Sequence, residues 1–240
     1  MNEALVLLPD ILCDARLYGP QLAAFSKTHA ITIAPVTGGD RIEEIASNLL
    51  DVLPRRFALG GLGLGACTAM EIVRRAPDRV TRIALMNASA FAETPEAAAD
   101  FEPVITKARA GNLQGFATGI IPPDTLAPGP MRGEIMALVH DMADHLGKDV
   151  LIRQARALQR RRDYQAVLRK ITMPALVLCG ASDGPAPVKR HSFLADLIPY
   201  AELCVIEGAG RLPPLEQPDL VTDALLSWLR LPLAQGLRAT

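Results

Sequence analysis

A cluster of glycines between an apolar run and a helical pattern constrains the fold of this chain more than any other feature. The short run Phe57-Ala58-Leu59 is apolar, glycines follow at once, and apolar residues then recur at helical spacing from Ala66 to Val73. This order predicts a strand, an abrupt turn and a helix that packs closely against the strand. It is the context of the nucleophile elbow Gly-x-Ser-x-Gly, which reads Gly61-Leu62-Gly63-Leu64-Gly65 here. Gly63 stands at the position of the nucleophile and has no side chain that could attack a substrate.

Short apolar runs alternate with amphipathic helical patterns through most of the sequence. Apart from the strand at the elbow, the runs predicted to be strands are residues 4–8, 30–34, 81–86, 175–179 and 203–206. Helical patterns lie between them, as at residues 41–53, where the apolar residues fall on one helix face. Alternating strands and helices are typical of a parallel α/β sheet that is covered by helices. The chain is therefore predicted to form a sheet of about six strands.

The strand pattern disappears between Ser89 and Lys170. Helical patterns dominate this stretch, at residues 95–110, 131–146, 149–161 and 164–169, with a proline-rich break at 122–130. We therefore predict a core made of residues 1–88 and 171–240 and a helical cap made of residues 89–170. An insertion that follows the C-terminal end of a strand would cover the crevice in which α/β sheets bind ligands.

The composition limits the classes of protein to which the chain can belong. With 240 residues the chain fits one domain with an inserted lobe, and its 50% of hydrophobic residues suffice for a sizeable core. A net charge of -1 gives no footprint for nucleic acid or for an anionic membrane. The first residues lack a basic segment, and no apolar run approaches the roughly 18 residues of a membrane span. We therefore expect a cytoplasmic protein that binds neither nucleic acid nor membrane.

No cofactor or metal ion is expected from the sequence. The four cysteines show no Cys-x-x-Cys spacing and no nearby histidine ligands, which favours a reducing compartment and no metal site. The segment Gly61–Ala66 also matches the looser dinucleotide pattern Gly-x-Gly-x-x-Gly/Ala. The following strand, however, ends at Asn87 and not at an acidic residue that would bind the ribose. A nucleotide cofactor is therefore disfavoured.

Two further loops follow predicted strands and carry distinctive motifs. The first reads Leu8-Pro9-Asp10-Ile11-Leu12-Cys13-Asp14, and the second reads Leu178-Cys179-Gly180-Ala181-Ser182-Asp183. With the elbow and the helical insertion, these loops resemble the α/β-hydrolase family with a helical cap, above all its small bacterial esterase-like members, whose first strand ends Leu-Pro-Gly-Leu-Leu-Cys-Asp. The resemblance covers nearly the whole chain, although the antiparallel hairpin that opens longer members is missing. It implies an α/β-hydrolase fold, with a mostly parallel sheet of about six strands, flanking helices and an inserted helical cap.

The resemblance also implies where the catalytic groups of such an enzyme would stand. The family uses a nucleophile at the elbow, an acid after a late strand and a histidine after the last strand. Asp183 matches the acid position, whereas Arg211 occupies the histidine position in the loop Gly208-Ala209-Gly210-Arg211. Arginine is always protonated, so Arg211 cannot act as a general base near neutral pH. With Gly63 at the elbow, the nucleophile and the base are both absent, and standard Ser-His-Asp hydrolysis is not expected.

The oxyanion loop departs from the family pattern as well. The resemblance implies that the backbone N–H groups of Ile11 and Leu64 are the oxyanion donors. Asp10 replaces the family's glycine beside Ile11. A carboxylate at this position would oppose the negative charge that the two donors exist to stabilise.

Asp10, Asp183 and Arg211 are expected to converge at the C-terminal edge of the sheet. The favoured interpretation is that Arg211 forms an ion pair with Asp183 and so fills the space of the histidine. The alternative is that Arg211 stays partly free and binds a carboxylate or another anionic group. Two neighbouring carboxylates weaken this alternative, because they already neutralise one arginine.

Four other residues are candidates for the pocket or for a substitute nucleophile. Ser89 follows a strand that ends near the pocket and is expected to line it, without a histidine that would activate it. Cys67 lies one helical turn after the elbow and is interpreted as a buried structural thiol. Arg153 and Gln154, on a predicted cap helix, are further pocket candidates, and a solvent-facing position stays open for Arg153.

These observations favour a non-hydrolytic pseudoenzyme with an α/β-hydrolase fold and a degenerate catalytic triad. Its capped pocket would bind a small, mostly apolar molecule, or its surface would bind a partner protein. The alternative is an enzyme without a covalent nucleophile, such as a lyase, isomerase or cyclase, that uses Asp10 or Asp183 as its acid or base. An esterase-type hydrolase with a non-standard site is a third interpretation.

Overall fold

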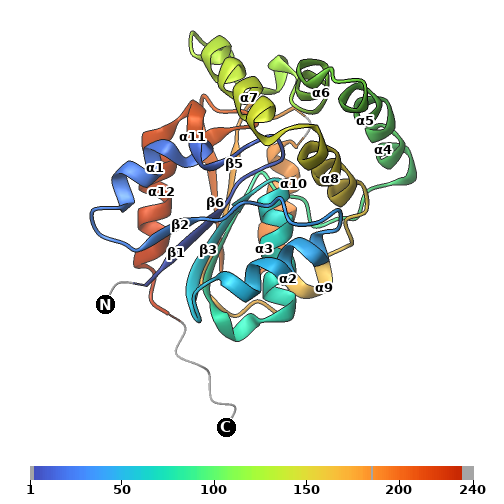
Figure 1. The fold of residues 1–240 in the computed structure, drawn as a ribbon. Coiled ribbons are helices and arrows are strands. Elements are labelled where there is room, and N and C mark those ends of the chain that lie inside the picture. Colours follow the sequence, from blue (N-terminus) through green and yellow to red (C-terminus); the bar gives the residue numbers. More distant parts are fainter. Residues whose placement is uncertain (1–2, 185, 234–240) are drawn as a thin grey trace.

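The computed structural model describes residues 3–184 and 186–233. Within these residues, six strands form a single parallel sheet with the order β2-β1-β3-β4-β5-β6 (Figure 1). The strands are β1 (Leu5–Leu8), β2 (Ile31–Ile33), β3 (Phe57–Leu62), β4 (Val80–Met86), β5 (Ala175–Gly180) and β6 (Ala201–Ile206). The predicted parallel α/β sheet of about six strands is therefore confirmed.

The central strands are apolar because helices cover both faces of the sheet. β1, β3 and β5 are buried along their whole length, whereas the edge strands β2 and β6 are only partly buried. One face carries α1 (Gly19–Phe25), α11 (Pro213–Glu216) and α12 (Pro218–Arg230), and the other carries α2 (Ile42–Val52), α3 (Leu64–Arg75) and α10 (Val188–Leu197) (Figure 1). Short 3-10 helices lie at Ala15–Tyr18, Pro77–Arg79 and Pro123–Thr125. None of the helices in the described ranges is long and apolar enough to cross a membrane.

Residues 87–174, all of them described, form helices and loops between β4 and β5. The helices are α4 (Pro95–Ala99), α5 (Phe101–Arg109), α6 (Leu113–Ile120), α7 (Arg132–Leu146), α8 (Lys148–Gln159) and α9 (Gln165–Leu168). We call α4–α8 the cap helices, and Figure 1 shows them above the sheet, from α7 at the top centre to α4 at the upper right. The division into core and cap domains at residues 88/89 and 170/171 stays a prediction, and residues 1–2 and 234–240 of that core lie outside the described residues.

The single helix predicted over residues 95–110 is divided in two. Pro103 lacks the N–H that would bond to the carbonyl of Ala99, so a continuous helix cannot be hydrogen-bonded across this turn. The chain instead ends α4 at Ala99 and begins α5 at Phe101. α6 was not predicted, because its two glycines lower its helix propensity.

Candidate functional site

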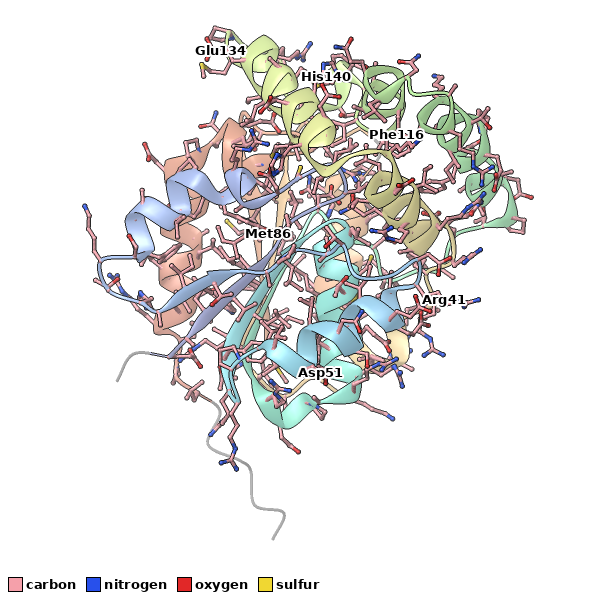
Figure 2. All side chains as sticks on the ribbon, in the orientation of Figure 1. Arg41, Asp51, Met86, Phe116, Glu134 and His140 are labelled. Carbon is pink, nitrogen blue, oxygen red and sulfur yellow. The ribbon has the colours of Figure 1, made fainter. Side chains whose placement is uncertain are left out.

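The turn between β3 and α3 forms the centre of the candidate site. Gly63 joins the two elements with φ 52° and ψ -108°, a conformation that favours glycine. Its N–H donates to the carbonyl of Met86 at 3.0 Å, which ties the elbow to the end of β4. A Cβ on Gly65 would lie 2.1 Å from the carbonyl oxygen of Leu8, so only glycine lets α3 sit this close to β1. Figure 2 shows Met86 near the middle of the molecule, below the cap helix that carries Phe116.

The Asp10 carboxylate occupies both predicted oxyanion donors. Its Oδ1 accepts hydrogen bonds from the N–H of Ile11 at 2.8 Å and from the N–H of Leu64 at 2.7 Å. The side chain of Asp10 is fully buried, and a buried carboxylate needs such partners to offset its lost hydration. The oxyanion loop and the elbow therefore meet as predicted, but the group bound between them belongs to the protein itself.

Arg211 holds the other oxygen of the Asp10 carboxylate. Its Nη2 and Nε donate to Asp10 Oδ2 at 3.1 and 3.3 Å. Burial lowers the pKa of Arg211, but the charges of Asp10 and Asp183 raise that pKa above its usual value, so the guanidinium stays protonated. The favoured prediction of an ion pair with Asp183 is wrong. Across the described part of the chain, Arg211 forms an ion pair with Asp10 alone.

Asn87 explains why Arg211 does not pair with Asp183. The Asn87 amide donates to Asp183 Oδ2 and to the carbonyl oxygen of Arg211, both at 3.0 Å. Its Oδ1 accepts from the N–H of Gly180 at 3.2 Å. These bonds hold the backbone of Arg211 beside Asp183, so the long arginine side chain extends past this acid to Asp10. Asn87 was missed as a site residue, although its position directly after the strand next to the elbow marks it as a candidate.

Asp183 follows β5 in the loop where the family places its acid. It is 2% exposed, and its Oδ1 has no hydrogen-bond partner among the described residues. Burial raises the pKa of Asp183 to about 6, and the opposing charge of Arg211 only partly offsets this effect. Within the described residues no histidine forms a hydrogen bond with Asp183, so its carboxyl group orients no imidazole.

A cavity of about 390 Å³ adjoins the elbow, between the sheet and the cap helices. Gly63 and Arg211 line it from the core, Ser89 lines it from the loop after β4, and the cap helices contribute the apolar side chains Phe101, Val104, Ile120 and Leu158. Charged side chains also line it: Glu93, Asp100, Arg161, Arg190 and Arg211. Charged and apolar side chains therefore both line the cavity, whereas a mostly apolar ligand was expected. A larger hollow of about 1050 Å³, beside the beginnings of β4 and β5, contains none of the predicted site residues.

Ser89 and Cys67 both line the cavity, but neither has a group that would activate it as a nucleophile. Burial raises the pKa of Cys67, which disfavours the reactive thiolate. The Ser89 hydroxyl accepts from the N–H of Phe91 at 3.3 Å, and none of the described histidines lines the cavity. The described residues also contain no cluster of three His, Cys, Asp or Glu side chains that could hold a metal ion.

The two cap residues that were candidates for the pocket, Arg153 and Gln154, contact other parts of the chain. Gln154 is fully buried; its Oε1 accepts from the N–H of Leu12 at 3.2 Å, and its Nε2 donates to the carbonyl of Val36 at 3.3 Å. Arg153 donates to the carbonyl of Thr37 at 3.4 Å. Neither residue lines the cavity, because this face of α8 lies against the loops that follow β1 and β2. Gln154 instead ties the oxyanion loop to the cap.

Sequence comparison finds relatives with hydrolase names, although no family model matches the chain. A putative carbamate hydrolase RutD from Agrobacterium fabrum is 28% identical over 204 residues, which cover 81% of this chain and 76% of that protein. A pimeloyl-[acyl-carrier protein] methyl ester esterase from Aromatoleum aromaticum is 26% identical over 198 residues, which cover 75% of this chain and 77% of the esterase.

Solved structures share the fold over nearly the whole chain. A thermophilic esterase from Thermogutta terrifontis, in its malate-bound form, superposes with a TM-score of 0.84 and 24% identity, covering 96% of this chain and 91% of the esterase. The enol-lactonase from Burkholderia xenovorans LB400 gives a TM-score of 0.83 and 25% identity, covering 96% of this chain and 93% of the lactonase. The sheet order, the elbow at Gly63 and these likenesses define the class as that of the α/β hydrolases. The chain belongs to the α/β-hydrolase fold family.

Proposed function

We propose that this protein is a non-hydrolytic member of the family, which binds a small molecule in the cavity beside the elbow. The observation that supports this most directly is the Asp10 carboxylate, bonded at once to the N–H groups of Ile11 and Leu64. In a hydrolase these two donors stabilise the negative oxygen that forms on the substrate. Here both are already used, and the charge of Asp10 would repel that oxygen.

The other two catalytic positions point to the same conclusion. Gly63 has no nucleophilic atom, and Arg211 cannot remove a proton from one. The acid alone contributes nothing to acyl transfer, because its task is to orient and stabilise a histidine. A protein with this set of groups is expected to keep only the small rate acceleration that binding provides.

The cavity supports a small-molecule ligand over a partner protein. It is open beside Gly63 and is bounded by residues from both the core and the cap. Its volume of about 390 Å³ lies within the range of roughly 300 to 1,000 Å³ that is usual for small-molecule pockets. An occluded site filled by cap side chains would have favoured a purely structural role.

An enzyme without a covalent nucleophile is less well supported. A pKa of about 6 would suit Asp183 for proton transfer, but Asp183 does not line the cavity. Asp10 is held by the hydrogen bonds of Ile11, Leu64 and Arg211, and it does not line the cavity either. Neither of the two carboxylates predicted as its acid or base is therefore placed to exchange a proton with a bound molecule.

The test is hydrolysis of p-nitrophenyl esters with short and medium acyl chains. We expect the unaltered protein to match the buffer rate. The triple variant Asp10→Gly, Gly63→Ser, Arg211→His restores the family pattern at all three positions and is expected to hydrolyse the esters. The matched control is Asp10→Gly, Gly63→Ala, Arg211→His, which differs from the triple variant by one hydroxyl oxygen and should be inactive.

Hydrolysis by the unaltered protein would contradict the proposal if it persisted through further purification. Changing Ser89 or Cys67 to Ala would then show which side chain carries it. A folded but inactive triple variant would show that residues other than these three also differ from what an active hydrolase needs.

A further inference from the structure

We propose that the cavity binds a small monocarboxylic acid with an apolar chain, whose carboxylate lies between Arg190 and Arg211. This proposal rests on the small-molecule binding role proposed above and assigns the chemical class of the ligand. Three arginines line the cavity but differ in how far other groups engage them, and apolar side chains of the cap helices line it as well.

Arg211 retains unused donors on the cavity side. Its Nε and Nη2 both donate to a single oxygen, Asp10 Oδ2. A guanidinium has five N–H groups, and Nη1 makes no hydrogen bond within the described residues. The Arg211 side chain keeps 20% of its surface exposed and lines the cavity. The remaining donors are therefore available to an acceptor in the cavity.

Arg190 supplies the positive charge that Arg211 cannot. Asp10 already neutralises Arg211, whereas Arg190, on α10, forms no ion pair with any described acid and lines the same cavity. The third arginine, Arg161, is engaged by Glu93 at 2.7 Å and by the carbonyl of Phe91 at 3.0 Å. An anionic group would therefore be attracted to Arg190 and bonded by Arg190 and Arg211 together.

The apolar part of the lining selects the rest of the ligand. The cap side of the cavity carries the apolar side chains Phe101, Val104, Ile120 and Leu158, which favour a hydrocarbon chain. Asp100, at the junction of α4 and α5, also lines the cavity and has no described ion-pair partner. A second carboxylate at the far end of the ligand would meet this negative charge. The cavity should therefore prefer a monocarboxylate to a dicarboxylate of equal length.

Calorimetric titration near neutral pH with three probes of similar length tests the assignment. Hexanoate carries one carboxylate, hexanamide is its neutral counterpart, and adipate adds a second carboxylate at the other end of the chain. We expect hexanoate to bind, hexanamide to bind at least about tenfold more weakly because it loses the charge-assisted bonds, and adipate to bind more weakly than hexanoate. Asp100→Asn should reduce the difference between adipate and hexanoate.

Variants on α10 distinguish direct contact between Arg190 and the ligand from a general effect of positive charge on the affinity. Arg190→Gln should weaken hexanoate binding about tenfold or more, since a hydrogen bond to a charged group is lost. Lys189→Gln removes the same charge from the neighbouring exposed residue, which does not line the cavity, and should change the affinity little. Arg190→Lys keeps the charge without the planar fork and should give an intermediate affinity. Melting temperatures confirm that each variant is folded.

Each outcome decides between the two proposals. If hexanamide binds as tightly as hexanoate, or hexanoate does not bind, the carboxylate assignment is wrong while the non-hydrolytic role stands. Equal losses from Arg190→Gln and Lys189→Gln would show that a diffuse charge and not Arg190 holds the anion. Hydrolysis of p-nitrophenyl hexanoate by the unaltered protein would instead overturn the non-hydrolytic role itself.

Discussion

A Cβ on Gly63 would lie 2.0 Å from Asp10 Oδ1, so the elbow cannot carry a side chain while this carboxylate bridges the oxyanion donors. Asp10 is bonded in turn to Arg211. The three departures from the hydrolase pattern are therefore one physical unit. Restoring the serine alone would place new atoms against the Asp10 carboxylate. Restoring the histidine alone would remove the positive charge of Arg211 that this carboxylate is bonded to.

The variant Gly63→Ser is expected to lose stability and to gain no esterase activity. The new side chain overlaps Asp10 and also has to adopt a positive φ of 52°. Forced overlap in a packed site costs about 1–3 kcal/mol, measured as the free energy of unfolding in urea. Gly111→Ser is the control, because Gly111 has a φ of 80° with no atom within 4 Å of a Cβ. Equal losses in the two variants would show that Asp10 moves aside without cost.

The variant Asp10→Ala is expected to lose more stability than the variant Asp10→Asn. Alanine leaves the N–H groups of Ile11 and Leu64 and the charge of Arg211 without their acceptor. The expected loss is about 3 kcal/mol, the lower part of the range for a buried ion pair, because the Arg211 side chain keeps 20% of its surface exposed. Asparagine keeps an oxygen for the two amides and should lose less.

Formate provides an independent test of the same site. It should fit the space left by the Asp10→Ala substitution and restore stability by an amount that grows with the logarithm of its concentration above the dissociation constant, as expected for a ligand that binds only the folded state. Asp10→Asn should not respond, because its own amide fills the space. A loss below about 1 kcal/mol for Asp10→Ala, or no response to formate, would contradict the role assigned to this carboxylate.

Asp183 is expected to make the protein less stable as the pH rises. Its pKa in the folded protein is about 6, against an ordinary value of 3.8, so the folded state holds the proton more tightly than the unfolded state. The stability contributed by the protonated form is complete below pH 3.8 and is lost as the pH rises to about 6. The full loss is about 3 kcal/mol.

The variant Asp183→Asn tests whether ionisation of Asp183 lowers the stability of the folded protein. Its neutral amide keeps an oxygen for the Asn87 hydrogen bond but has no charge to lose. We expect the variant to be more stable than the unaltered protein near neutral pH, and the two stabilities to converge in acid. Urea unfolding measured across the acidic range gives the comparison. A variant that is less stable at every pH would show that the Asp183 charge stabilises the site.

The sequence predicted those parts of the fold that depend on local patterns of residues. Glycines at 61, 63 and 65 and apolar runs at β1, β4 and β5 place the strands and the elbow, because buried parallel strands are continuous apolar runs. α6 was missed because glycines weaken its helical signal. The meeting of the loops that carry Asp10 and Arg211 was also predictable, since all parallel strands end at the same edge.

The pairing of side chains within the site was not predictable in the same way. Arg211 was expected to pair with Asp183, and the choice of Asp10 depends on Asn87, which holds the Arg211 backbone from a different strand. Gln154 was a candidate for the pocket, but it bonds to the loops after β1 and β2. Helical periodicity locates a face of the helix and does not identify what packs against that face. Both outcomes depend on contacts between segments that are distant in the sequence.

Removing the Gln154 side chain is expected to lower the stability of the protein by a measurable amount. It is buried and bonds to the N–H of Leu12 and the carbonyl of Val36, so Gln154→Ala leaves two backbone groups unsatisfied at a cost of about 2–4 kcal/mol in unfolding free energy. Leu12 has a φ of 70°, and its amide should exchange hydrogen faster in the variant. Arg153→Ala, the neighbouring residue with one long 3.4 Å hydrogen bond, should cost less than about 1 kcal/mol. Similar losses in both variants would show that α8 is held by packing alone and that the oxyanion loop keeps its shape without Gln154.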